Sequence, residues 1–190
     1  MGTRNLPENI WEAGKSTGPP YHPLAPMRRM GVLLSCAAGK YGIYPVFKDK
    51  MDVDISFSCS EINWNIISET LKQVGMAYYE PDLHKKAFEA SHITVFAWHG
   101  GKLIGFGRAI SDGVYQAAVY DVAVMPEFQG KGIGSIIMKN ILNQLSHCNI
   151  ILYASPGKEK FYETLHFRKM KTGMALFTKA EVMAERGFTE

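Results

Sequence analysis

The chain has 190 residues, of which 46% are hydrophobic, and a formal net charge of +3 at pH 7. This length is enough for one domain with a sizeable core and gives no reason to expect two. Basic and acidic residues are scattered and nearly balanced, which excludes the strongly basic pattern of a nucleic-acid-binding protein. No apolar run reaches the roughly 20 residues that a membrane helix needs. We therefore expect neither a nucleic acid nor a membrane as a partner.

The three cysteines are Cys36, Cys59 and Cys148, an odd count without any CxxC spacing. Such a set offers neither a disulfide framework nor the ligand spacing of a zinc site. The sequence thus predicts a reduced, cytoplasmic protein without a bound metal.

Residues 1–50 are rich in proline and glycine, as in "STGPPYHPLAP", and show no sustained helical or strand period. Three interpretations stay open: an extension of weak order, an arm packed through its aromatic residues, or a segment that precedes a true start at Met51. A regular pattern begins at Met51. We therefore divide the chain into an N-terminal extension of residues 1–50 and a domain of residues 51–190.

The first half of this domain predicts strands and two helices with short connections. Alternating apolar residues predict strands at 53–59, 92–99, 102–111 and 114–125. Apolar residues at helical spacing predict a helix at 60–75, with Ser60 as its N-cap and Gly75 at its end. A second helix is predicted at 81–91, where Pro81 occupies the first turn.

The second half continues with a helix from a glycine-rich loop to about residue 146, and with a strand at 149–155. This strand is almost wholly apolar, so we expect it to be buried on both faces. The remaining predicted elements are a short helix at 157–167, two strands at 168–173 and 174–178, and a helical turn at 179–186. This order favours a mixed sheet with helices on both faces.

The glycine-rich stretch "QGKGIG" at residues 129–134 lies between a predicted strand and a predicted helix. The first turn of a helix carries N–H groups without intrahelical partners and about half a positive charge from the helix dipole, so it binds anions. Glycines let the backbone approach such an anion closely, and Lys131 adds a positive charge. The spacing matches neither the GxxxxGK[ST] of the P-loop nor the GxGxxG of dinucleotide-binding folds. We predict a phosphate-binding loop of another kind.

Gln129, Gly132 and Gly134 fill the three defined places of the pattern [QR]-x-x-G-x-[GA]. This pattern resembles the acetyl-CoA signature of the GNAT superfamily of N-acetyltransferases. The resemblance follows the order of elements from about Asp54 to Thr178 and is specific at residues 119–139 and 150–167. It implies an α/β fold of mixed α+β type, in which helices flank a central, mixed and mostly antiparallel sheet.

The resemblance also implies a set of residues that bind acetyl-CoA. The backbone groups expected to pair with the pantetheine arm are those of Val122, Ala123 and Val124. The amides expected to hold the diphosphate are those of Gln129, Gly130, Lys131, Gly132, Ile133, Gly134 and Ser135. Ser155 stands where relatives often place a polar residue that contacts the cofactor.

Tyr162 matches the family's general-acid tyrosine, which protonates the departing thiolate; the alternative is an aromatic residue that only packs. Asp121 interrupts an apolar strand, so we expect it either to act as the general base or to make a structural hydrogen bond. The other candidate bases are Glu80, His84 and His92. Tyr79 and Glu80 are the expected rim of the acceptor site.

One position departs from the family pattern. Relatives commonly have Gly-Phe after the helix that carries the tyrosine, whereas this chain has His166-Phe167. Glycine supplies a left-handed turn easily and histidine does so at a cost. Either the turn differs here or His166 adopts the left-handed conformation.

The resemblance implies an enzyme that transfers an acetyl group from acetyl-CoA to the primary amine of a small molecule, such as an amino sugar or an aralkylamine. Two alternatives stay open. One is acetylation of a protein or peptide amine, and the other is a module that binds acyl-CoA without catalysis. Small members of this family are often dimers, so a homodimer is among the expected states.

Overall fold

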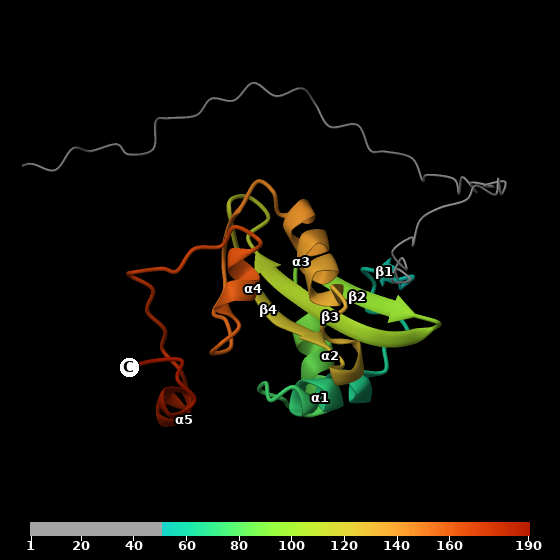
Figure 1. Cartoon of the computed structure of the whole chain (residues 1–190), viewed down its shortest axis with the longest axis horizontal. Helices are drawn as coiled ribbons and strands as arrows, with labels where there is room; N and C mark the ends of the chain where they lie inside the picture. The colour runs from blue at the N-terminus through green and yellow to red at the C-terminus, as the bar shows by residue number, and fades with distance from the viewer. Residues whose placement is uncertain (1–50) are drawn as a thin grey trace, which may run out of the picture. The chain divides into compact units, whose positions relative to one another are not determined.

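The structure is a computed structural model that describes residues 51–190, so the interpretations of residues 1–50 lie outside the described residues. Figure 1 shows the arrangement of the helices and strands. In chain order they are β1 (Asp54–Ser56), α1 (Trp64–Gln73), α2 (Pro81–Glu89), β2 (Ile93–His99), β3 (Lys102–Ser111), β4 (Gln116–Val124), the 3-10 turn η1 (Pro126–Phe128), α3 (Ile133–Gln144), β5 (Asn149–Ile151), α4 (Glu159–Glu163) and α5 (Ala180–Glu185). Within residues 51–190, no helix is long and apolar enough to cross a membrane.

The five strands form one sheet in the order β1-β2-β3-β4-β5. The pairs from β1 to β4 are antiparallel, and β4 pairs with β5 in parallel. The expected mixed and mostly antiparallel sheet is therefore confirmed. Strands β2, β3 and β4 form a meander because short turns join neighbours along the chain, as at Gly100 and Gly101, which both have positive φ.

Helices cover both faces of the sheet (Figure 1), as the order of the predicted elements indicates. One apolar cluster joins α3 to the sheet through residues such as Ile137 and Val95, which are fully buried. A second cluster joins α1 and α2 to the other face through Leu71, Phe88 and Phe96. In β2 the odd positions pack toward α3 and Phe96 packs toward α1 and α2, which is the period-two alternation of a strand buried on both faces.

Helix α1 begins later than the sequence predicts. Its N-cap is Asn63, whose side-chain oxygen accepts a hydrogen bond from the N–H of Asn65 at 3.1 Å, so the assignment of Ser60 was wrong. Glu61 has a left-handed backbone (φ 62°), which prevents a helix from running through it. At the other end, Gly75 (φ 74°) follows the helix and ends it as expected.

Two predictions about the last part of the chain were wrong. No strand is found at 168–173 or at 174–178, although the described chain includes both segments. Strand β5 is not buried on both faces, because it has three residues, pairs only with β4, and leaves Ile151 50% exposed. An apolar run forms a buried strand only where other strands pair with it and helices cover it. The sequence of the run does not show whether such neighbours are present.

Two glycines of β3 let α3 lie close to the sheet. A Cβ atom added at Gly105 would lie 3.0 Å from both the carbonyl oxygen of Ala123 and the Cδ1 of Ile137. At Gly107 it would lie 3.0 Å from the Cγ2 of Ile137 and 3.1 Å from that of Val122. The close approach of α3 to β3 and β4 therefore depends on the absence of a side chain at Gly105 and Gly107.

We expect Gly105→Ala to lower the free energy of unfolding by about 1–3 kcal/mol, because the added methyl group overpacks a fully occupied core. Urea unfolding at neutral pH measures the change. Gly173→Ala is the matched control, since its new Cβ would meet only the side chain of Met170, at 3.4 Å. Equal unfolding free energies for the two variants would contradict this account of the packing.

Candidate active site

Strand β4 contains one extra residue at Asp121, whose backbone is left-handed (φ 52°). Pairing with β3 passes from Arg108–Tyr120 to Phe106–Ala123, so two residues of β4 lie opposite one residue of β3. The side chains that pack toward α3 change from odd to even positions across this bulge: Ala117 and Val119 before it, Val122 and Val124 after it. The bulge therefore decides which face of the sheet each later residue of β4 occupies.

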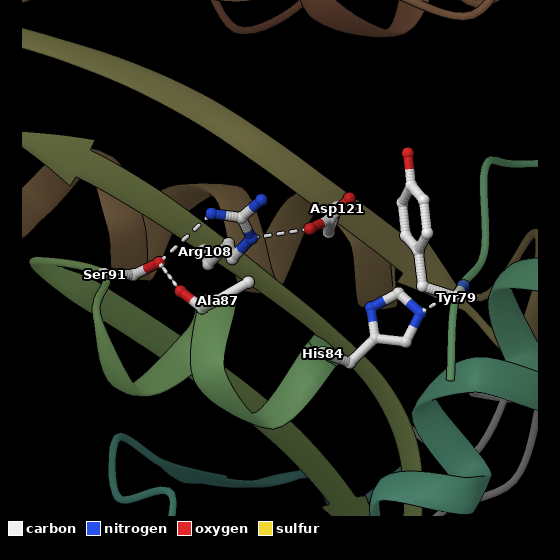
Figure 2. Close-up of polar contacts among 6 residues, drawn as sticks. All are labelled: Tyr79, His84, Ala87, Ser91, Arg108 and Asp121. Carbon is white, nitrogen blue, oxygen red and sulfur yellow. Dashed lines mark hydrogen bonds and ion pairs between the residues drawn. The ribbon is translucent and has the colours of Figure 1, made fainter. Parts of the chain in front are cut away.

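Arg108 holds the side chain of Asp121. The guanidinium Nε donates to Asp121 Oδ2 at 2.5 Å, and Nη1 donates to Ser91 Oγ at 3.2 Å. Ser91 in turn donates to the carbonyl of Ala87 near the end of α2 (Figure 2). Both charged side chains are largely buried, with 17% of Arg108 and 21% of Asp121 exposed. The second carboxylate oxygen of Asp121 has no hydrogen-bond partner among residues 51–190.

The other candidate bases lie in different surroundings. His84 is buried, and its Nε2 accepts a hydrogen bond from the N–H of Tyr79 at 2.9 Å (Figure 2). Burial lowers the pKa of the imidazole, so it is neutral, and its lone pair is already used by the backbone. His92 lies against Gly113 in the turn between β3 and β4, at the opposite end of β4 from its bulge. Glu80 is exposed at the N-cap of α2.

The outer edge of β4 is open over its second half. Pairing with β5 runs from Gln116–Asn149 to Ala118–Ile151, whereas β4 continues to Val124. Along the described chain no strand pairs with β4 on this side after Ala118. The backbone groups on this edge, which include the predicted cofactor contacts Val122 to Val124, are therefore available to a ligand that lies alongside them as another strand would.

A run of unpaired backbone donors follows directly. The six consecutive N–H groups from Gly130 to Ser135 donate to no acceptor within residues 51–190, and the next one, of Ile136, bonds to the carbonyl of Gly132. Gly132 is the N-cap of α3 with a left-handed backbone (φ 84°), and no side chain caps the helix. A Cβ atom at Gly130 or Gly132 would meet nothing within 4 Å, so the space in front of these donors is open. Such a helix start suits an anion.

Gln129 joins this loop to the end of the strand. Its side-chain Nε2 donates to the carbonyl of Val124 at 3.0 Å, and its own N–H donates to the carbonyl of Pro126 at 3.2 Å. Because its backbone N–H is engaged, Gln129 positions the loop, and the unpaired backbone N–H groups begin at Gly130. Lys131 adds a charge there, with its Nζ 5.0 Å from the centroid of the Phe128 ring.

Helix α4 packs against the end of β4 and the first turn of α3. A Cβ atom at Gly134, in the first turn of α3, would lie 3.4 Å from the Phe161 ring and 3.9 Å from Val124. Tyr162 follows Phe161, and its ring packs against that ring with 5.0 Å between centroids. Burial raises the pKa of the Tyr162 phenol, which keeps it protonated at neutral pH. The structure thus places the helix that carries Tyr162 against the end of β4 and the start of α3, through Phe161.

The remaining predicted residues lie around this region. Ser155 is partly buried in the connection between β5 and α4, and its carbonyl accepts the N–H of Lys158 at 2.9 Å. Tyr79 is 59% exposed in the loop between α1 and α2. His166 has φ 68°, so the histidine adopts the left-handed turn for which relatives use glycine.

Arg108 is a residue that sequence reasoning missed. It belongs to no motif, and the only signal for it is a charge inside a largely apolar strand, as for Asp121. Pairing across β3 and β4 brings the two charges together, and the strand register is known only from the structure.

The sequence of this chain is similar to those of known acetyltransferases. The sequence model described as the acetyltransferase (GNAT) family matches residues 59–167. The chain is 29% identical over 119 residues to the uncharacterized N-acetyltransferase ycf52 of Porphyra purpurea, which covers 61% of this chain and 64% of that protein. It is 31% identical over 117 residues to serotonin N-acetyltransferase 2, chloroplastic, of Oryza sativa subsp. japonica, covering 58% of each chain. Over 143 residues it is 27% identical to histone acetyltransferase TAP1 of Glycine max, covering 68% of this chain and 58% of that protein. The chain thus spans less than two thirds of the length of these relatives.

Solved structures show the same fold. A probable acetyltransferase from meticillin-resistant Staphylococcus aureus has a TM-score of 0.60 and 23% identity over 66% of this chain and 99% of its own. Glucosamine-6-phosphate N-acetyltransferase from Arabidopsis thaliana has a TM-score of 0.53 and 17% identity over 67% of this chain and 99% of its own. These likenesses confirm the expected fold, and the family match covers more than half of the sequence. The chain belongs to the GNAT family of acetyltransferases.

Proposed function

We propose that this enzyme transfers an acetyl group from acetyl-CoA to the primary amine of a small molecule by direct attack. The observation that carries the proposal is the row of six free N–H groups from Gly130 to Ser135, which begins just beyond the open edge of β4. Donors of this kind at a helix start fit a diphosphate, and Lys131 adds a positive charge beside them. The unpaired edge fits an amide-bearing arm such as pantetheine.

These features divide the binding of acetyl-CoA among parts of the chain. The diphosphate is held by the amides from Gly130 to Ser135, with Gln129 positioning the loop through its bond to Val124. The pantetheine arm is held by the backbone of Val122 to Val124, and Ser155, in the connection between β5 and α4, offers a hydroxyl to the cofactor. When bound, acetyl-CoA supplies the acetyl group as an activated thioester.

In this proposal, two side chains transfer protons and one backbone N–H stabilises negative charge. The Tyr162 hydroxyl, which its raised pKa keeps protonated, donates its proton to the departing thiolate. The carboxylate oxygen of Asp121 that Arg108 leaves free accepts a hydrogen bond from the attacking amine and receives its proton. A backbone N–H near Val124 stabilises negative charge on the carbonyl oxygen.

The acceptor is a small-molecule amine, with Tyr79 and Glu80 at its rim. A relative named for serotonin acetylation supports this class, because that name describes an amine of small size. The relative named as a histone acetyltransferase supports the alternative of a protein amine. The predicted cytoplasmic location stays a prediction, since the rice relative is named as chloroplastic.

Thiol release in the presence of acetyl-CoA and a panel of amines tests the proposal. The panel contains glucosamine 6-phosphate, 2-phenylethylamine, spermidine and a lysine-bearing histone peptide. Turnover of a small amine supports the proposal, and turnover of the peptide alone replaces it with protein acetylation. Binding of coenzyme A without turnover of any amine leaves a module that binds acyl-CoA and does not catalyse.

We expect Gly132→Asp to abolish coenzyme A binding, because its carboxylate would stand in the open space in front of the amides and repel the diphosphate. Isothermal titration with coenzyme A measures this effect. Gly132→Asn is the matched control, with nearly the same size and the same tolerance of a left-handed backbone but no charge. The diphosphate site would be refuted if the two variants bound coenzyme A equally well.

We expect Tyr162→Phe to lower kcat by about 100-fold, the size typical for loss of a general acid, and to leave the KM for acetyl-CoA nearly unchanged. Steady-state thiol release measures both constants. Tyr115→Phe is the control, because Tyr115 is 59% exposed in the turn between β3 and β4. An unchanged kcat in the Tyr162 variant would reduce this tyrosine to a packing role.

A further inference from the structure

The C-terminal end of the chain contains a rigid turn after α5. Gly187 has a left-handed backbone (φ 76°), and its N–H donates to the carbonyl of Ala184 at 2.8 Å. The N–H of Phe188 donates to the carbonyl of Met183 at 2.9 Å. This pair of hydrogen bonds is the Schellman arrangement, in which glycine allows the chain to reverse and satisfies the last carbonyls of the helix. The position of Phe188 relative to α5 is therefore fixed.

This turn links two loops that border the proposed active site. The guanidinium of Arg186 donates to the carbonyl of Gly75, at the start of the loop that leads to Tyr79. On the other side, a Cβ atom at Gly187 would lie 3.7 Å from the Cγ of Pro156, in the connection that leads from β5 to α4. The last residues of the chain thus hold together the loop of the predicted acceptor rim and the loop that carries Ser155.

Phe188 belongs to an aromatic group centred on Tyr153. The Tyr153 ring meets three other rings nearly edge to face: Tyr120 at 5.9 Å and 74°, Phe177 at 5.7 Å and 80°, and Phe188 at 5.8 Å and 83°. Tyr153 is 53% exposed, so this group lies at the surface and is not part of the two apolar cores. Its exposed edges and faces are available to another ring.

The aromatic group adjoins the predicted acid–base residue. Tyr120 directly precedes Asp121 in β4, and its ring lies 5.3 Å from the guanidinium carbon of Arg108. Burial raises the pKa of the Tyr153 phenol, and the charges of Tyr120 and Asp121 raise it further, so the phenol stays protonated. An apolar aromatic surface thus lies next to one free carboxylate oxygen. That combination suits a molecule with an aromatic ring and an amine.

We propose that Tyr120, Tyr153 and Phe188 form the acceptor surface and select amines that carry an aryl ring, with the amine directed to Asp121. Phe188 acts as a specificity-determining residue, and Arg186 is a positioning residue that keeps the C-terminal turn against Gly75. This inference rests on the proposed function, because it assigns the acceptor of the same reaction. Two features indicate this ligand: the carboxylate of Asp121 complements an amine, and Tyr120 lies in the part of β4 that does not pair with β5.

The experiment compares kcat/KM for 2-phenylethylamine with that for n-hexylamine, at saturating acetyl-CoA, in the full-length chain. We expect the wild-type enzyme to prefer 2-phenylethylamine and Phe188→Ala to lower this preference by about 3- to 10-fold, the effect of losing one aromatic contact. The change should lie in the KM for the amine, with kcat and the KM for acetyl-CoA nearly unchanged. Phe57→Ala is the matched control, because Phe57 is 50% exposed and follows β1 at the opposite edge of the sheet.

Arg186→Gln gives a second test that leaves every aromatic ring in place. We expect it to weaken the preference in the same direction, and Arg186→Lys to restore part of it. Turnover of amines without preference for the aryl substrate, or an unchanged preference in both the Phe188 and the Arg186→Gln variants, would overturn this inference and leave the proposed function intact. Absence of thiol release with every amine would instead refute the proposed function and the inference with it.

Discussion

The ion pair between Arg108 and Asp121 is the interaction on which the site depends. A left-handed backbone at a residue other than glycine costs about 1–2 kcal/mol, so the bulge at Asp121 persists because its side chain is held. Arg108 supplies that hold from the neighbouring strand, and Ser91 fixes Arg108 to the end of α2. With the extra residue in place, Val122 and Val124 pack toward α3 and the strand ends beside the start of that helix.

In the proposed function, two ligands would meet at the end of β4. On one side, β4 does not pair with β5 after Ala118. This unpaired edge leads to the free backbone amides at the start of α3. On the other side the bulge presents one carboxylate oxygen next to the rings of Tyr120 and Tyr153. Tyr162 comes from α4, which packs against the first turn of α3. A cofactor along the edge and an amine beside the bulge would therefore meet at the end of one strand.

The sequence predicts local features of this site well. The glycine loop between β4 and α3 depends on glycines, a helix start and a preceding strand that are close together in the sequence, so the pattern contains the whole backbone feature, while the binding of phosphate there stays a prediction. The same holds for the left-handed Gly75 after α1 and for the meander of β2 to β4. The left-handed His166 was one of two expected outcomes, because the family pattern has glycine at that position.

Features that depend on distant partners were missed or misassigned. Asp121 is a conspicuous charge in the sequence, but its partner Arg108 is found only through the strand register. The apolar residues 149–155 and 174–178 indicate strands, yet Met174 and Leu176 are 98% and 100% exposed because no neighbour pairs with that segment. Gly187 indicates the C-terminal turn in the sequence. The contacts of this turn with Gly75 and Pro156 join residues far apart in the chain, so the sequence does not indicate them.

The central claim is that the backbone amides from Gly130 to Ser135 grip the diphosphate of coenzyme A. Amide resonances of a ¹⁵N-labelled protein, followed during titration with coenzyme A and separately with pantetheine, test it most directly. Coenzyme A should shift these amide protons downfield as they become hydrogen-bonded, whereas pantetheine, which has no diphosphate, should leave them in place. Unshifted amides at saturating coenzyme A, or equal shifts with both compounds, would contradict the account.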